Sequence, residues 1–390
     1  MNICIIARGF PTTEHPQWGC FEKDQAEALA AYGHHVVVIS VDARFKRHRG
    51  SIGLHKFDDN GVGYYNYVML PEIFFSKIMG KGICRRIRLF YIEKMFKKTI
   101  HDDGNPDIIY SHFFWNTYVA VLLKEKYHIP VVGIEHLGRF NESVLPDETE
   151  RLASYAFPRA DAMIAVSKKL GENIKNRFHI DCAVVNNMYG QEFLNPQIIT
   201  STSLPKQKIV FISVARIDYK KGFDVLINAF KKANLPQNAW VLKIIGWGDE
   251  VGNLKKLIAS NNLQANISFL GKKSKDEIVQ ELRNSDVFVL ASRLETFGIV
   301  YIEAMSQGLP VIGTICGGPE EIINSSNGIL VPSDDVDAMS EAIKNMIETY
   351  SRYDRRKIAE DCQKSFSPRA IAGQITDVFE TVLNKKRNGL

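Results

Sequence analysis

Short apolar segments recur along the whole chain and constrain its fold more than any other feature. They form two sets, which are NICIIA, HVVVIS, DIIYS, PVVGIE, AMIAVS and AVVN in the first half, and KIVFISVA, WVLKIIG, NISFLG, DVFVLA, PVIGT and GILVP in the second. Amphipathic stretches separate the segments within each set. Buried strands that alternate with helices are typical of parallel sheets covered by helices on both faces. The sequence therefore predicts an α/β protein with two parallel, doubly wound sheets.

The segment between the two sets, GQEFLNPQIITSTSLPKQK, indicates where one sheet ends and the other begins. It is polar and contains Pro, Ser and Thr, as interdomain linkers often do. A chain of 390 residues is also too long for one ordinary core. We therefore expect an N-terminal domain over residues 1–195 and a C-terminal domain over residues 196–367.

A dinucleotide-dependent enzyme is a rival interpretation, because such enzymes are also doubly wound. However, RGFPTTEHPQWGC follows the first strand of one set and RIDYKKG follows that of the other, and neither contains G-x-G-x-x-G. The G-x-G from Gly246 to Gly248 follows the second strand of the second set but lacks the third glycine. The sequence therefore disfavours NAD or FAD binding.

The most informative local segment runs from Ser292 to Glu321 and reads SRLETFGIVYIEAMSQGLPVIGTICGGPEE. It places Glu295 in a strand-to-helix loop and Glu303 about one turn inside the following helix. Such a loop is where α/β proteins bind phosphates. Two carboxylates at this place suit a polyhydroxylated ligand, because each can accept two sugar hydroxyl hydrogens.

A basic pair, Arg216 and Lys221, lies in the equivalent loop after the first strand of the second set, in VARIDYKKGFDVLINAF. A guanidinium and an ammonium that converge on a departing diphosphate would stabilise its charge without proton transfer. Removal of one such group would cost about 2–4 kcal/mol of transition-state stabilisation. The carboxylate pair alone could suggest a glycosidase, but these cations would serve no purpose in hydrolysing a neutral glycoside.

Together these segments resemble glycosyltransferase family 4, whose members are retaining enzymes with an E-x7-E signature. The match covers S-x-x-E-x-F-G, E-A-M-x-x-G-x-P-V-I, G-G-x-x-E and the R-x4-K-G pair. Thr296 stands where the family more often has Gly or Pro, and Ala215 stands where it often has Gly. The resemblance implies the GT-B fold, in which two Rossmann-like domains face a cleft that suits a nucleotide sugar and its acceptor. It also implies that a C-terminal helix, about residues 368–390, packs back on the first domain.

The resemblance implies a role for each matched residue. Glu303 would bind the ribose of the donor, and Glu295 would point at the transferred sugar. The backbone amides of Phe297, Gly298 and Ile299 would approach the sugar and phosphates. Arg216 and Lys221 would stabilise the leaving diphosphate, and Gly246 would line the donor site.

In the first half, PTTEHPQWGCFEKDQAEALAAYGHHVVVIS resembles the family's glycine loop and its helix. Gly19 fits a contact with the diphosphate or acceptor, but Cys20 replaces a commonly paired glycine. His136 and His112 lie at strand ends, in GIEHLGRFN and SHFFWNTYVA, and carboxyl ends of parallel strands face the ligand. The family often has a histidine at the position of His136, near donor sugar and acceptor. A structural hydrogen bond is the alternative role for both histidines.

No cluster of residues suggests a metal site. Asp102-Asp103 and Asp334-Asp335 read as turns, and we expect no strand-end D-x-D of the kind that clamps a diphosphate. The resemblance likewise implies metal-independent transfer, with Arg216 and Lys221 in place of a cation. We expect no cofactor apart from the substrate, a nucleotide diphosphate sugar with UDP or GDP as its nucleotide.

Composition and the lengths of the apolar runs limit the partners and the location that we expect for this protein. The formal net charge of +5 is mild, and we expect no nucleic-acid partner. The apolar runs are too short for a spanning helix, and the first residues read as a strand and not as a signal peptide. Six scattered cysteines without a C-x-x-C pair favour reduced thiols in the cytoplasm.

The segment from Phe74 to Lys98 carries eight basic residues and one acidic residue among large apolar ones. Such a segment can bind an anionic membrane, and each surface cation then adds about 1 kcal/mol. Packing of its apolar stripe on the first domain explains the same pattern. The charge excess favours a peripheral enzyme on the inner face of the cell membrane that uses a lipid-carried acceptor.

The sequence thus predicts a retaining, metal-independent hexosyltransferase. It would move a sugar to a glycan or lipid-linked acceptor, in the synthesis of a bacterial cell-surface polysaccharide. A nucleotide-sugar epimerase of GT-B fold and a non-catalytic nucleotide-sugar-binding subunit remain as alternatives, which product analysis with a donor panel would separate.

Overall fold

The computed structural model describes residues 1–12, 18–43, 51–69, 72–142, 144–194 and 208–388, without the side chains of residues 72–81. These residues divide into two compact units. Unit 1 comprises Met1–Val185 and Ile371–Leu390, and unit 2 comprises Asn186–Ala370. The predicted boundary at residues 195 and 196 lies outside the described residues.

Unit 1 is built on a sheet with the strand order β3-β4-β2-β1-β5-β6-β7-β8. Its central strands are continuous apolar runs, and β1 is buried at every residue after its first because helices cover both faces. The strands are β1 (Asn2–Ala7), β2 (His35–Asp42), β3 (Gly53–Asp59), β4 (Val62–Val68), β5 (Ile108–His112), β6 (Val131–Glu135), β7 (Ala162–Ala165) and β8 (Cys182–Val184). Each of the six strands predicted for the first half is present.

The prediction of an all-parallel first sheet is wrong at one edge. β3 and β4 form a hairpin, and β3 runs antiparallel to β4. In β3, half-buried and exposed residues alternate, which fits a strand at the edge of a sheet. Its sequence, GLHKFDD, has too little apolar character to read as a buried strand.

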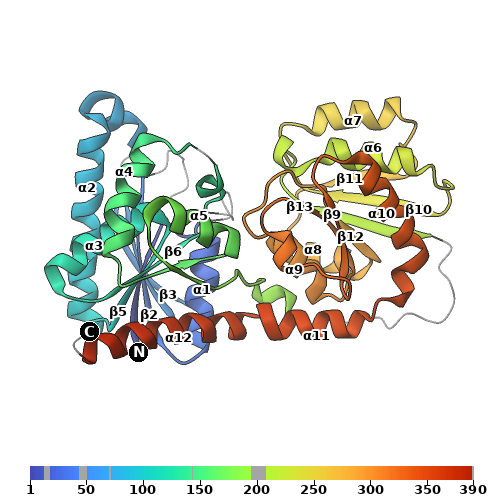
Figure 1. Ribbon diagram of the computed structural model, residues 1–390. Helices are drawn as coiled ribbons and strands as arrows, with labels where there is room; N and C mark the ends of the chain where they lie inside the picture. The colour runs from blue at the N-terminus through green and yellow to red at the C-terminus, as the bar shows by residue number, and fades with distance from the viewer. Residues whose placement is uncertain (13–17, 44–50, 70–71, 143, 195–207, 389–390) are drawn as a thin grey trace. The chain divides into compact units, whose positions relative to one another are not determined.

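Helices cover both faces of this sheet (Figure 1). α2 and α3 share one face, where Ile92, Met95 and Phe96 of α2 join the main core cluster. α1 lies on the opposite face (Figure 1). The helices are α1 (Cys20–Ala31), α2 (Glu72–Asp103), α3 (Phe113–Tyr127), α4 (Asp147–Ala156) and α5 (Lys168–Phe178).

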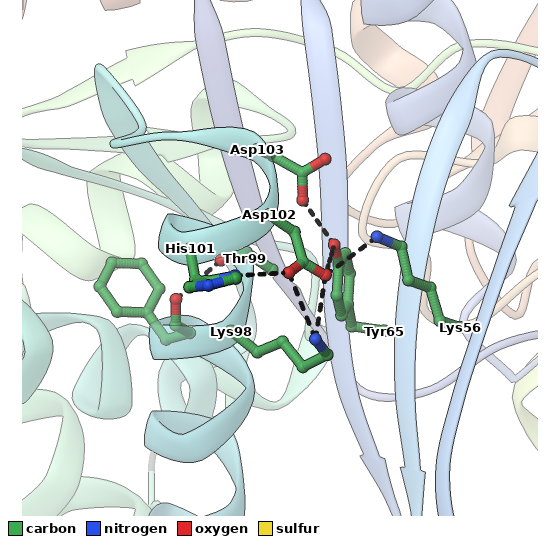
Figure 2. A network of polar contacts seen from close by, with 8 residues as sticks. Lys56, Tyr65, Lys98, Thr99, His101, Asp102 and Asp103 are labelled. Carbon is green, nitrogen blue, oxygen red and sulfur yellow. Dashed lines mark hydrogen bonds and ion pairs between the residues drawn. The ribbon is translucent and has the colours of Figure 1, made fainter.

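A polar network ties the last turn of α2 to the hairpin (Figure 2). The Asp102 carboxylate accepts hydrogen bonds from Lys56 Nζ at 3.0 Å and Lys98 Nζ at 3.2 Å, and the Tyr65 hydroxyl lies 3.1 Å from it and 2.5 Å from Asp103. These donors, together with His101, hold the pKa of Asp102 well below its usual range. The interpretation of Asp102-Asp103 as a turn is therefore wrong, because both residues end a helix.

Unit 2 repeats the plan with a parallel sheet in the order β11-β10-β9-β12-β13-β14. α6 and α10 pack together on one face, and α8 and α9 lie on the other (Figure 1). Its strands are β9 (Ile209–Val214), β10 (Trp240–Ile245), β11 (Ile267–Gly271), β12 (Val287–Val289), β13 (Val311–Ile315) and β14 (Gly328–Pro332). Its helices are α6 (Phe223–Ala233), α7 (Val251–Ser260), α8 (Lys275–Arg283), α9 (Ile299–Ser306), α10 (Val336–Thr349) and α11 (Arg355–Phe366).

The last helix, α12 (Pro368–Arg387), begins in unit 2 and continues in unit 1. In unit 1 its Phe379 ring packs edge-on against Tyr110 at a centroid distance of 5.1 Å. Thr376 Oγ1 lies 2.9 Å from His34 Nε2, and Lys386 Nζ donates to the His128 carbonyl oxygen. Buried apolar packing and more exposed polar contacts therefore join this helix to unit 1.

Candidate functional site

In unit 2 the strand order reverses direction at β9, whose neighbours are β10 and β12. In open α/β sheets, ligands bind outside the carboxyl ends of the strands at such a switch point. The loop after β9 contains the basic pair, and the loop after β12 contains the first glutamate of the E-x7-E segment. The topology therefore places the two predicted motifs on adjacent strands.

The basic loop can lie against the end of β12 because Gly222 has no side chain. Gly222 begins α6 with a φ of 61°, and a β-carbon there would collide with the carbonyl oxygen of Ala291. Lys221 immediately precedes this glycine in a short 3-10 turn, η4 (Tyr219–Lys221). The close approach therefore sets the position of Lys221.

Lys221 and Glu295 meet at the switch point. Lys221 Nζ lies 2.6 Å from Glu295 Oε1, which also accepts a hydrogen bond of 2.9 Å from Ser292 Oγ. The Glu295 side chain is 10% exposed and that of Lys221 is 22% exposed. Ser292, which the sequence analysis did not single out, thus orients the carboxylate, and the ammonium stays within reach of a ligand.

Arg216 differs from Lys221 in its surroundings. Its side chain is 58% exposed, with Nε 3.6 Å from Asp218 and Nη2 3.9 Å from Asp249. Exposed pairs at such distances are worth little. Among the described contacts, the structure brings Lys221 but not Arg216 to Glu295.

α9 presents its N-terminus in the same loop. Gly298 is its N-cap, Ile299 is its first residue, and Glu303 lies one turn in and is half-buried. The Phe297 side chain is buried and packs edge-on against Phe366 at 5.8 Å. The first backbone N–H groups of a helix have no hydrogen-bond partner within the helix, and they therefore favour the binding of an anion.

The loop after β10 adds an aromatic residue that the sequence analysis missed. Gly246 follows β10, and a β-carbon there would collide with the Ala215 carbonyl oxygen, so the two loops touch. The next residue, Trp247, is 40% exposed, and Lys272 Nζ lies 5.0 Å from its ring centroid. In the sequence, the available signal for this residue was a tryptophan directly after a predicted strand.

In unit 1 the switch point lies at β1, between β2 and β5. His112 ends β5 and His136 follows β6, and the structure brings their side chains together, with His136 Nε2 3.2 Å from His112 Nδ1. The Phe21 ring stacks on His136, with centroids 5.5 Å apart. Gly19 is the N-cap of α1. Both histidines are buried, His136 to 8% exposure.

Glu135 holds the two histidine-bearing loops in place. Its buried carboxylate accepts hydrogen bonds from the backbone N–H groups of Phe114, His136 and Leu137 at 2.8 to 2.9 Å. Burial outweighs these bonds and raises the pKa of Glu135 to about 7. Burial and the nearby charge of Arg8 lower the pKa of His112 to about 3, so this imidazole is neutral.

No metal-binding cluster is evident in the part of the chain that the structure describes. No group of three or more His, Cys, Asp or Glu side chains there could hold a metal ion. Within the same residues, no helix combines the length and apolar character needed to cross a membrane.

Comparisons with known proteins agree on one family. The model for glycosyl transferases group 1 matches residues 195–364, and that for glycosyltransferase family 4 matches residues 23–189. An uncharacterized glycosyltransferase of Methanocaldococcus jannaschii is 31% identical over 284 residues, which are 70% of this chain and 74% of that protein. A lipopolysaccharide core biosynthesis glycosyltransferase of Rhizobium meliloti is 28% identical over 64% of this chain and 71% of its own. The solved structure of Anabaena HepE in complex with UDP superposes with a TM-score of 0.71 at 18% identity, over 98% of this chain and 100% of that one.

Proposed function

The chain belongs to the family 4 glycosyltransferases and has the GT-B fold, and from this premise we propose that it transfers a sugar from a nucleotide diphosphate donor with retention at the anomeric carbon. Unit 2 binds the donor, and unit 1 supplies the acceptor site with His136. The donor is a UDP- or GDP-sugar, which the UDP complex of the Anabaena protein supports. The transferred group is a hexose.

The contact between Lys221 and Glu295 carries this proposal. The Lys221 ammonium, which would stabilise the leaving diphosphate, lies 2.6 Å from the Glu295 carboxylate, which would bind the sugar, and both lie at the switch point. The bond from the anomeric carbon to the diphosphate oxygen breaks as the bond to the acceptor oxygen forms on the same face. The acceptor's proton passes to the leaving diphosphate, whose charge Lys221 and Arg216 stabilise.

Two further donor contacts complete the proposed site. Glu303 accepts hydrogen bonds from the ribose hydroxyls, and the first amides of α9 approach the sugar and phosphates. With these groups the transfer needs no divalent metal, because Arg216 and Lys221 neutralise the diphosphate. Activity should therefore persist in EDTA, and an enzyme that loses activity in EDTA and regains it with Mg²⁺ would contradict this part.

A donor panel tests the proposal directly. A ligand at 100 times its dissociation constant stabilises the folded protein by about 2.7 kcal/mol, so a thermal-shift screen of nucleotide sugars should identify the donor. Product analysis then decides the reaction. Glycosylated acceptor supports the proposal, whereas an epimerised donor or a bound but unchanged donor supports one of the two alternatives.

The acceptor is a glycan or a lipid-linked glycan of the bacterial cell surface. Relatives in lipopolysaccharide core biosynthesis support this assignment. Such an acceptor places the enzyme in the cytoplasm, at the inner face of the membrane.

One face of α2 provides the membrane contact in this proposal. Ile83, Arg86, Phe90, Lys94 and Lys97 lie at helical spacing and are exposed, Phe90 to 61%; we call them the α2 stripe. Cations around an exposed aromatic residue suit an anionic lipid surface.

Neighbouring arginines of α2 have other partners in unit 1. Arg85 forms a 2.6 Å ion pair with Glu148, and the Arg88 guanidinium lies over the Trp115 ring. The test of membrane binding therefore reverses charges within the stripe. Arg86→Glu with Lys94→Glu should release the protein from anionic vesicles in a sedimentation assay at low salt. Lys255→Glu with Lys256→Glu, an equal change at exposed residues of unit 2, should still pellet; equal sedimentation of both variants would exclude the stripe.

A further inference from the structure

Arg293, two residues before Glu295, connects three loops at the carboxyl edge of the unit 2 sheet. Its Nη1 and Nη2 atoms donate to the two carboxylate oxygens of Asp224 at 2.9 and 2.8 Å, at the start of α6. Nε donates to Asp334, in the loop after β14, at 2.6 Å. Nη1 also donates to the carbonyl oxygen of Tyr219, in the basic loop, at 2.7 Å.

The surroundings of Arg293 distinguish it from an ordinary surface cation. Its side chain is only 12% exposed, and the Tyr219 ring lies over the guanidinium at 4.0 Å. The Arg293 backbone N–H donates to the Lys220 carbonyl oxygen at 2.7 Å. The main chain and the side chain of Arg293 therefore both hold the basic loop. Its bidentate pair with the Asp224 carboxylate also fixes the orientation of the guanidinium.

These contacts bear on Lys221, because both carbonyl groups that Arg293 binds belong to the turn that ends at this lysine. Lys221 Nζ must stay near Glu295 Oε1 to present its charge to a diphosphate, and a loop that shifts moves the ammonium with it. A displacement of about 1 Å in a site of this kind can cost about 100-fold in rate.

We propose that Arg293 is a positioning residue of the donor site, which fixes the basic loop so that Lys221 meets the donor's diphosphate beside Glu295. The inference rests on the proposed function, since it requires Lys221 to bind that diphosphate. Lysine cannot replace this arginine, because one ammonium cannot reach Asp224 with two bonds, Asp334 and the Tyr219 carbonyl at the same time.

A double-mutant cycle on nucleotide binding tests the proposal. UDP and GDP are titrated calorimetrically into wild type, Arg293→Lys, Lys221→Ala and the double variant, with the better-binding nucleotide carried through the cycle. Arg293→Lys should weaken binding about 10- to 100-fold in the wild-type background. When Lys221 is already absent, the same change should weaken it less than about threefold, because residues that act through one another are not additive.

Arg355→Lys is the matched control. The Arg355 guanidinium also joins two segments of unit 2, through the carbonyl oxygens of Gly308 and Ser285, but it holds no part of the basic loop. Its replacement should lower the thermal unfolding midpoint without weakening nucleotide binding. If Arg293→Lys does not fold, Asp334→Asn keeps an oxygen acceptor for Nε but removes the carboxylate charge, and it should produce a smaller loss, of about threefold, with the same dependence on Lys221.

The outcomes separate the inference from the function on which it rests. A wild type that binds neither nucleotide contradicts the proposed donor site and the inference with it. Binding that needs Lys221 but tolerates Arg293→Lys overturns the inference alone. Equal losses in both Lys221 backgrounds, or an equal loss from Arg355→Lys, would show that Arg293 supports only the general stability of unit 2.

Discussion

The two units share a sheet plan but place different chemistry at its carboxyl edge. At the unit 2 switch point, charged side chains remain accessible, with Lys221 22% and Arg216 58% exposed. At the corresponding edge of unit 1, His112 and Glu135 are fully buried and His136 is 8% exposed. One edge therefore presents charge to a ligand, and the other encloses hydrogen-bonding groups among aromatic rings.

This difference suits the two substrates of the proposed reaction. A diphosphate needs fixed cations at its developing charge. A sugar acceptor is neutral at its reacting hydroxyl and needs oriented hydrogen-bonding groups. The neutral state of His112, whose pKa is lowered to about 3, fits the second requirement. The comparison teaches that a shared fold constrains where a site lies but not which chemistry it performs.

The largest expected effect distinguishes the two edges by what a single substitution at each does to turnover and to nucleotide affinity. Lys221→Ala should lower turnover about 100- to 1,000-fold and weaken binding of nucleoside diphosphate, because one leaving-group cation is lost. His136→Ala should lower turnover while the dissociation constant of the nucleoside diphosphate stays at the wild-type value. Steady-state kinetics and calorimetry measure both quantities. A nucleotide affinity that falls equally in both variants would contradict the division of labour.

A second, smaller effect sharpens the assignment within unit 2. Glu303→Ala should weaken binding of nucleoside diphosphate about 10-fold or more, since hydrogen bonds to a charged group are worth about 1.5–3 kcal/mol. Inhibition by inorganic pyrophosphate, which has no ribose, should be unchanged. Circular dichroism checks that the variant is folded. Wild-type transfer by folded Glu303→Ala protein would show that the ribose assignment is wrong.

The sequence predicted unit 2 better than unit 1 for a physical reason. Every strand of the unit 2 sheet is an apolar run with turn residues at its ends, and its site residues lie in short loops directly after those strands. In unit 1 the hairpin β3–β4 escaped prediction. Its edge strand β3 needs no continuous apolar run, and the inner strand β4, VGYYNYV, mixes Gly, Asn and Tyr with its valines. Asp102 and Asp103 end a helix, and the left-handed Gly104 that follows them is the stop signal that the turn interpretation did not use.

Within the site, the sequence identified groups but not their partners. Lys221 and Glu295 were predicted from separate motifs, and their contact depends on the order of β9 and β12 in the sheet. The contacts of Arg293 join segments that are 41 to 74 residues apart, so no local pattern contains them. The Glu135 hydrogen bonds were equally hidden, because their donors are backbone groups.

A third expected effect concerns the buried edge of unit 1 and the dependence of its stability on pH. The folded-state pKa of Glu135 is about 7, against an ordinary value of 4.5. The folded protein therefore binds more protons than the unfolded chain between these values, and this carboxyl makes unfolding easier as pH rises from about 4.5 to 7. The loss is at most about 3 kcal/mol. His112 has the opposite sign, because its lowered pKa makes stability rise with pH between about 3 and 6.5.

Glu135→Gln isolates the first contribution, because glutamine does not titrate while His112 is unchanged. Urea unfolding from pH 5 to 8 should give a free energy of unfolding that falls with pH more steeply in the parent protein than in Glu135→Gln. Both proteins should carry Trp240→Phe and Trp247→Phe, which leave Trp18 and Trp115 of unit 1 to report by fluorescence. Parallel curves for the two proteins would mean that Glu135 titrates normally in the folded state. The three backbone hydrogen bonds to Glu135 would then fully offset the effect of its burial.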